Sequence, residues 1–205
     1  MLSKRLETII SLIDKNKSVI DIGTDHAILT ITISQINITS KIIATDIKEN
    51  ICKKAQNSIN KANINNIKII QSDGFKNIQE KYDIAILSGM GTHTILNIIK
   101  NSKCPETLII SSQNDYEMLR RELNKLNYKI IKEIVIYEKK YYPIIKYKKG
   151  KEKLTENDII FGKSNNKEYY KYLQNKYLNL YNKSKTEEFK NNYNKLTEII
   201  EKMSN

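Results

Sequence analysis

The chain has 205 residues, of which 40% are hydrophobic and 28% are charged, a composition that fits a folded domain and excludes a disordered or fibrous chain. No apolar run approaches the roughly 20 residues that cross a membrane, and the two cysteines, Cys52 and Cys104, lack the spacing of a metal site. The net charge of +12 favours a polyanionic partner, although heavy use of Lys, Asn and Ile also follows from an AT-rich coding sequence. We therefore expect a cytoplasmic protein with no metal, no membrane partner and no evident obligate protein partner.

The chain opens with an amphipathic helix, whose apolar residues Leu6, Ile9, Ile10 and Ile13 recur at helical spacing. Short apolar runs then alternate with helix-length segments, which predicts an α/β fold with a doubly wound, Rossmann-like parallel sheet. The expected strands are residues 18–23, 41–47, 67–73, 83–88, 107–111, 130–137 and 142–147. The expected helices between them are residues 26–35, 49–62, 94–100 and 116–127.

The composition changes near Lys148, and after Gly150 the chain is rich in Lys, Asn, Glu and Tyr. We therefore predict two domains, residues 1–150 and 151–205. Two apolar stripes in the second domain predict a coiled-coil-like helical hairpin. Ser184 and Glu187 match a capping box that would start the second helix, with the turn at residues 182–185. The stripes consist of Tyr169, Leu173, Tyr177 and Leu180, and of Phe189, Tyr193, Leu196, Ile200 and Met203.

The first strand ends in Asp21-Ile22-Gly23-Thr24-Asp25-His26-Ala27. Gly23 permits a tight turn, and the N-terminus of the next helix offers free backbone N–H groups to a polar ligand. Asp25 stands where a dinucleotide-binding G-x-G-x-x-G loop has its second glycine, and a carboxylate there would repel a pyrophosphate. A ligand with an amino group and a sulfonium suits this loop, which favours S-adenosylmethionine over NAD.

Acidic residues also follow the next two strands. Asp46, 23 residues after Gly23, is placed to accept hydrogen bonds from ribose hydroxyls, and Asp73 lies within reach of an adenine amino group. The fourth strand ends in Ser88-Gly89-Met90-Gly91, whose glycines let the backbone pass close to a ligand. The predicted cofactor-binding residues are Asp21, Gly23, Thr24, Asp25, His26, Asp46, Ile47, Asp73, Gly74, Ser88, Gly89, Met90 and Gly91.

These motifs resemble those of the bacterial tRNA (adenine-22-N1)-methyltransferases, which have a similar opening Leu-Ser-Lys-Arg-Leu, an Asp-His-Ala after the first strand and a Gly-Met-Gly after the fourth. The resemblance implies a class I methyltransferase sheet and a C-terminal helical appendage that aids tRNA contact. It also implies methylation of N1 of adenine 22 in the D arm, with S-adenosylmethionine as donor. The sequence departs from the family at Thr92, where relatives often carry glycine, and at Asn114, where a proline commonly follows the glutamine. The matching residues are 2–6, 21–27, 73–74, 89–91, Gln113, 119–120 and 159–162.

Adenine N1 has an unshared electron pair in the ring plane, so we expect positioning to contribute more than a strong base. The methylated ring is cationic and would be stabilised by a nearby carboxylate or amide oxygen. Asp25, Gln113 and Asp115 are the candidates for this catalytic role.

A basic segment interleaved with tyrosines is the predicted track for tRNA phosphates. Tyr141 and Tyr142 are candidates for stacking on the target base, although packing between strands also explains them. The candidate RNA-binding residues are Lys139, Lys140, Lys146, Lys148 and Lys149.

Two alternative functions use the same sequence features. A small-molecule methyltransferase would keep every pocket residue but leave the basic tail unexplained. A catalytically silent RNA-binding module would keep the fold, and the departures at Thr92 and Asn114 are compatible with it. The sequence leaves open the tRNA species, the oligomeric state and whether the target base is flipped.

Overall fold

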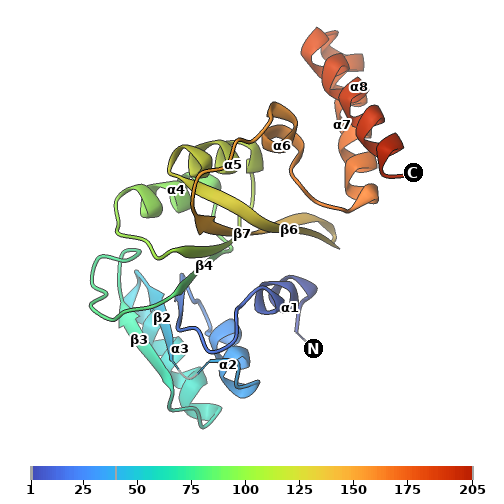
Figure 1. The fold of residues 1–205 in the computed structure, drawn as a ribbon. Helices are drawn as coiled ribbons and strands as arrows, with labels where there is room; N and C mark the ends of the chain where they lie inside the picture. The colour runs from blue at the N-terminus through green and yellow to red at the C-terminus, as the bar shows by residue number, and fades with distance from the viewer. Residues whose placement is uncertain (1, 40, 205) are drawn as a thin grey trace.

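In the computed structural model, a seven-stranded sheet with strand order β3-β2-β1-β4-β5-β7-β6 forms the centre of the molecule (Figure 1). The structure describes residues 2–39 and 41–204, so Met1 and Asn205, the outer limits of the two predicted domains, lie outside the described residues. The strands β1 to β5 run parallel, whereas β7 is antiparallel to both β5 and β6. The predicted doubly wound α/β sheet is confirmed. Its strands are β1 (Val19–Ile22), β2 (Ile42–Asp46), β3 (Ile67–Gln71), β4 (Ile84–Ser88), β5 (Thr107–Ser111), β6 (Tyr128–Glu138) and β7 (Lys140–Lys149).

Helices cover both faces of the sheet, because successive side chains of each strand point to opposite faces. Val19 packs into a core with α1, α2 and α3, whereas its neighbour Ile20 packs into a second core with α4 and α5. Burial on both faces explains why the central strands are continuous apolar runs. The helices are α1 (Lys4–Ser11), α2 (Ile28–Gln35), α3 (Glu49–Lys61), α4 (Thr92–Lys100) and α5 (Tyr116–Lys125).

The last two strands are longer than the sequence pattern indicated. They pair from Tyr128↔Lys149 to Glu138↔Lys140, with one register shift between Ile130 and Lys132, and only Lys139 forms the turn, with a left-handed φ of 62°. Lysines at the ends of these strands interrupt the pattern of apolar residues, so the apolar pattern alone predicted shorter strands. No helix in the described ranges is long and apolar enough to cross a membrane.

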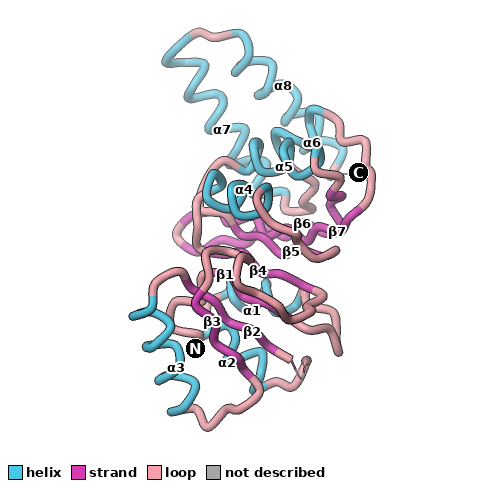
Figure 2. Tube along the Cα trace, turned by 90° about the vertical axis from the view of Figure 1, so that its left-hand side faces the viewer, coloured by secondary structure: helices cyan, strands magenta, loops and turns pink. Residues whose placement is uncertain are grey.

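The predicted helical hairpin is confirmed, and it extends away from the sheet (Figure 2). The predicted capping box is wrong. Helix α7 (Lys167–Ser184) continues through Ser184, whose Oγ donates to the carbonyl of Leu180, and α8 (Glu187–Lys202) begins after the N-cap Thr186. The turn is shorter than predicted because Lys185 adopts a left-handed conformation, with φ 56°, that ends α7 at once.

A short helix that the sequence reading missed, α6 (Glu156–Phe161), precedes the hairpin. It begins with a capping box between Thr155 and Asp158. Its six residues are too few to show a helical period, but the capping pattern was present in the sequence.

A buried ion pair joins α6 to the sheet. The guanidinium of Arg120 on α5 contacts both carboxylate oxygens of Glu133 on β6, with Nη2–Oε1 2.5 Å and Nε–Oε2 3.2 Å, and both side chains are fully buried. Arg120 Nη1 also donates to the carbonyl of Ile159, and the N–H of Lys163 donates to Glu133. Burial alone would lower the pKa of Arg120, but the charge of Glu133 and the hydrogen bonds to it together outweigh that effect and raise the pKa.

Gly162 has no room for a side chain beside this pair. Its φ is 87°, and an added Cβ would lie 2.4 Å from Glu133 Oε1 and 2.5 Å from Arg120 Nη2. The backbone at Gly162 therefore packs directly against the two charged groups. The chain then enters α7, and the side chain of its N-cap residue Asn166 donates a hydrogen bond to the carbonyl of Val135 on β6.

We expect Glu133→Ala to lower the free energy of unfolding by about 3 to 5 kcal/mol, because it leaves the Arg120 charge buried without its partner. Urea denaturation measures this loss. Glu156→Ala is the matched control, since Glu156 is an exposed carboxylate that pairs with Arg121, and its removal should change stability little. Equal losses for the two variants would contradict a special role for the buried pair.

Candidate functional site

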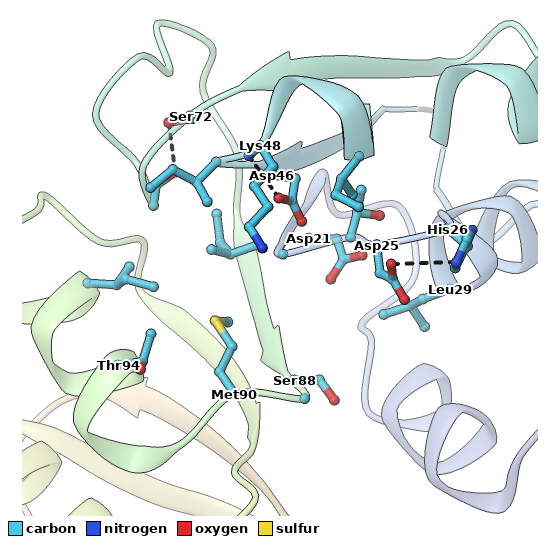
Figure 3. A pocket seen from close by; sticks show the side chains of 18 of the residues that line it. Asp21, Asp25, His26, Leu29, Asp46, Lys48, Ser72, Ser88, Met90 and Thr94 are labelled. Atoms are coloured by element: carbon cyan, nitrogen blue, oxygen red, sulfur yellow. Dashed lines mark hydrogen bonds and ion pairs between the residues drawn. The ribbon is translucent and has the colours of Figure 1, made fainter. Parts of the chain in front are cut away.

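A cavity of about 730 Å³ lies at the carboxyl ends of β1, β2, β3 and β4, between α1 and α4 (Figure 3). Asp21, Asp25 and Asp46 lie on one side of it, with Met90 and Thr94 across from them. This edge is the usual ligand site of a doubly wound sheet, because loops that leave neighbouring strands in opposite directions open a crevice there.

The loop between β1 and α2 is more sharply bent than predicted. The N–H groups of Gly23 and Thr24 both donate to the carbonyl of Thr45, at 2.9 and 2.8 Å, and Gly23 has φ 79°. Asp25 and Ala27 also have positive φ, at 51° and 59°, so α2 cannot begin at residue 26 and starts at Ile28 instead. The bend turns the Asp25 carboxylate into the cavity lining.

Asp21 is a buried carboxylate in the lining, with 4% of its surface exposed. Burial raises its pKa from 3.8 to about 6, and the negative charge of Asp46 contributes to the rise. Because this pKa is higher in the folded chain than in an unfolded one, the group lowers stability as the pH rises from about 4 to about 6, and the loss is complete above that range. A cationic ligand group beside Asp21 would remove that cost.

Asp46 and Asp73 occupy the ends of the next two strands. Asp46 Oδ1 accepts a hydrogen bond from the N–H of Lys48 at 3.0 Å, which leaves Oδ2 available to a ligand. Asp73 is more exposed and pairs with Lys76 at 2.5 Å. The two carboxylates and Asp21 thus form a row along the cavity edge.

Twelve of the thirteen predicted cofactor-binding residues line the cavity, the exception being Gly91, which is the N-cap of α4. Of the candidate catalytic residues, Asp25 and Gln113 line it. Gln113 is anchored by a 2.6 Å hydrogen bond from its Nε2 to the carbonyl of Gly89. Asp115 lies outside the lining because its carboxylate caps α5, accepting from the N–H of Met118 at 3.1 Å.

The sequence reading missed part of the lining. Helix α1 contributes Arg5 and Leu6, which belong to the opening Leu-Ser-Lys-Arg-Leu motif but gave no sign that α1 folds against the cavity. Thr94, Asn97 and Ile98 follow helical spacing on α4, so their shared face was visible in the sequence. The other lining residues not predicted are Ile22, Ile28, Leu29, Lys48, Ile51 and Ser72.

The two departures from the family pattern contact each other. The N–H of Thr92 donates to Asn114 Oδ1 at 3.0 Å, and Thr92 Oγ1 donates to the backbone carbonyl of Asn114 at 2.6 Å. Thr92 is fully buried and also meets Ser112 Oγ at 2.8 Å. The Asn114 amide therefore caps the first turn of α4. Thr92 and Asn114 thus satisfy each other's hydrogen bonds, and both lie outside the cavity lining.

The five candidate RNA-binding lysines do not form one track. Lys139 and Lys140 lie at the β6–β7 turn, beside the cavity, where Lys140 Nζ donates to the carbonyl of Gln113 at 3.4 Å. Lys148 and Lys149 lie at the opposite end of β7, on the order of 25 Å along the strand, next to the start of β5. Lys146 is mostly buried and pairs with Asp14 at 2.7 Å.

The two candidate stacking tyrosines point to opposite faces of the sheet. Two cations lie over the Tyr142 ring, with Arg5 5.4 Å and Lys140 5.0 Å from the ring centroid. The Tyr141 ring packs among other tyrosines on the α7 side.

The two histidines occupy different positions relative to the cavity. His26 lines it, with Nε2 3.7 Å from Asp25 Oδ1, whereas His93 lies outside the lining. No group of three potential metal ligands occurs within residues 2–39 and 41–204.

Comparisons with known proteins match this sequence and fold. A family model described as a methyltransferase domain matches residues 2–145. A Bacillus subtilis protein named tRNA (adenine(22)-N(1))-methyltransferase is 30% identical over 143 residues, 67% of this chain and 60% of that protein. A Mycoplasma genitalium protein provisionally named a tRNA methyltransferase is 32% identical over 78% of this chain and 77% of its own. The structure of M. capricolum TrmK with S-adenosyl-homocysteine is 33% identical, with a TM-score of 0.86 over 98% of both chains.

We expect the Asp21 carboxyl to titrate with a pKa of about 6 in the ligand-free protein. Asp46→Asn should lower that pKa, because it removes a negative charge that opposes ionisation of Asp21. A pH titration of the carboxyl ¹³C resonances measures both values. Asp73→Asn is the control, and an Asp21 pKa that stays the same in Asp46→Asn would show that the two carboxylates do not interact.

Proposed function

The chain belongs to the family of bacterial tRNA (adenine-22-N1)-methyltransferases, and on that premise we propose that it transfers the methyl group of S-adenosylmethionine to N1 of adenine 22 in tRNA. The observation that carries the proposal is the row of Asp21, Asp46 and Asp73 around one cavity at successive strand ends. A small-molecule substrate would use the same cavity, but it would not use the cationic residues that lie beside the opening.

The chemistry of the lining fits S-adenosylmethionine. The cofactor has an ammonium, two ribose hydroxyls and an adenine amino group, all of which donate hydrogen bonds and so match acceptor carboxylates. We assign Asp21 to the ammonium, Asp46 to the ribose and Asp73 to the adenine amino group. When bound, the cofactor supplies an electrophilic methyl group on a positively charged sulfur, which the acidic lining also favours.

Catalysis in this site rests on positioning, because adenine N1 needs no deprotonation before it attacks. Gln113 is held at the cavity rim by its bond to Gly89, so its amide oxygen is free to stabilise the positive charge that develops on the adenine. The Asp25 carboxylate is exposed within the same lining and is the second group available for this role. Asp115 acts on the rim indirectly, by fixing the start of α5.

We also propose a division of labour along the chain, with residues 1–150 binding the donor and residues 151–205 contacting tRNA. Several contacts cross that boundary, including those from Arg120 to Ile159 and from Lys163 to Glu133, so the donor-binding part needs α6 to complete its core. The hairpin that follows carries the surface for a large polyanion. A tRNA substrate also places the enzyme in the cytoplasm.

The direct test is incubation of the protein with radiolabelled S-adenosylmethionine and a tRNA transcript that carries adenine 22. We expect label in 1-methyladenosine after digestion to nucleosides, and none from a transcript with guanine at position 22. Label in another nucleoside, or equal labelling of both transcripts, would contradict the proposed target. The affinity for tRNA should also fall as salt rises, since phosphate contacts release counterions.

We expect Asp46→Ala to weaken donor binding by about 1 to 3 kcal/mol, because the ribose loses hydrogen bonds to a charged acceptor. Isothermal titration calorimetry with S-adenosylmethionine measures the change, and the thermal transition should remain intact. Asp14→Ala, which removes an exposed carboxylate outside the cavity lining, should leave donor binding unchanged. Wild-type donor affinity in Asp46→Ala would remove Asp46 from the site.

A further inference from the structure

Three tyrosines from two separate parts of the chain meet at the β6–β7 turn, and we call this group the tyrosine surface: Tyr137, Tyr141 and Tyr172. Tyr137 and Tyr141 pair across the two strands, with ring centroids 5.1 Å apart. Tyr172, on the second turn of α7, lies 4.9 Å from Tyr141. Figure 1 shows this turn between α1 and the start of the hairpin.

Packing of the hairpin accounts for only part of this group. Tyr169 is buried behind Tyr141, at 5.4 Å, and packs with Phe161 and Leu173 in the core between the sheet and the hairpin. By contrast, 58% of Tyr137 and 48% of Tyr172 remain exposed. They are the only aromatic residues among the exposed large hydrophobic residues of the described chain, and both contact the same third ring. Exposed aromatic faces gathered in one place mark an interaction surface.

Two lysines, Lys139 and Lys140, lie at the turn that carries Tyr137 and Tyr141. Lys139 forms the turn itself and makes no ion pair with any residue that the structure describes. Lys140, next to Tyr141 in the chain, points to the opposite face, where its Nζ lies 5.0 Å from the centroid of the Tyr142 ring and donates to the backbone of Gln113, which lines the cavity. The turn therefore carries the aromatic rings and the uncompensated charge of Lys139, and it contacts the cavity rim through Lys140.

We propose that the tyrosine surface stacks on an unpaired base of the bound tRNA close to the target adenine, while Lys139 contacts a neighbouring phosphate. This inference rests on the proposed function, which identifies the polyanion as tRNA. A target base reaches an enzyme cavity only after it leaves its own stack, and a protein aromatic ring can replace the stacking that neighbouring bases lose. Tyr faces bind bases of any sequence, and adjacent lysines bind the backbone, so this combination fits single-stranded nucleic acid.

The test measures the affinity of the full-length protein for unmodified tRNA by filter binding at several salt concentrations. Tyr137→Ala and Tyr172→Ala should each weaken binding about fivefold or more without changing the slope of log Kd against log salt, because stacking releases no counterions. Lys139→Ala should lower that slope by about one. Tyr137→Phe and Tyr172→Phe should bind like the wild type, since they keep the ring, and so should Ile36→Ala, which removes an exposed apolar side chain elsewhere.

Wild-type affinity in both alanine variants would overturn the proposal, as would equal losses in the alanine and phenylalanine variants. An equal loss of affinity for a fully double-stranded RNA of similar length would also overturn it, because such an RNA offers no unpaired base. Failure of the proposed function gives a different pattern, in which the wild type binds tRNA but leaves adenine 22 unmethylated. Calorimetry with S-adenosylmethionine should give wild-type donor affinity for every variant in the series.

Discussion

The buried ion pair between Arg120 and Glu133 fixes how the two parts of the chain meet. Each charge loses its water on folding, which costs several kcal/mol per ion, so the fold is stable only when every donor and acceptor of the pair is matched. The structure meets that requirement with the carbonyl of Ile159 and the N–H of Lys163, both from the segment after the sheet. If this segment moved away, the pair would lose both of these hydrogen bonds, and Gly162 brings the backbone of the segment close to the two charges.

The position of the helical hairpin follows from that constraint. Because α6 is held against β6, α7 starts beside the β6–β7 turn and its tyrosines reach those of the two strands. Helix α1 approaches the same turn from the other face, where Arg5 lies over Tyr142 and lines the cavity. The two ends of the chain therefore flank the opening through which an acceptor base would enter, while the donor side is built from the strand ends between them.

The donor side carries a related electrostatic cost. Asp21 is buried close to Asp46, so its pKa is raised to about 6 and its charged form is held at the expense of stability. A site of this kind suits a positively charged ligand, since the ligand supplies the cation that the buried carboxylate lacks in the free protein. The two buried carboxylates differ in this respect: Glu133 is paired with Arg120 within the chain, whereas Asp21 has no cationic partner among the described residues, and we propose that a ligand supplies one.

The sequence by itself determined the features that depend on neighbours in the chain. The apolar runs specified the sheet, the acidic residues after three strands specified the cavity edge, and the stripes in the tail specified the hairpin, because period and motif are local properties. Only the tertiary structure decided which of these residues meet. It brought Arg5 to the cavity, used Asp115 and Gly91 as helix caps, separated Lys148 from Lys139 and tied α6 to the sheet. Those outcomes depend on contacts between residues far apart in the chain, and no local pattern in one sequence records such contacts.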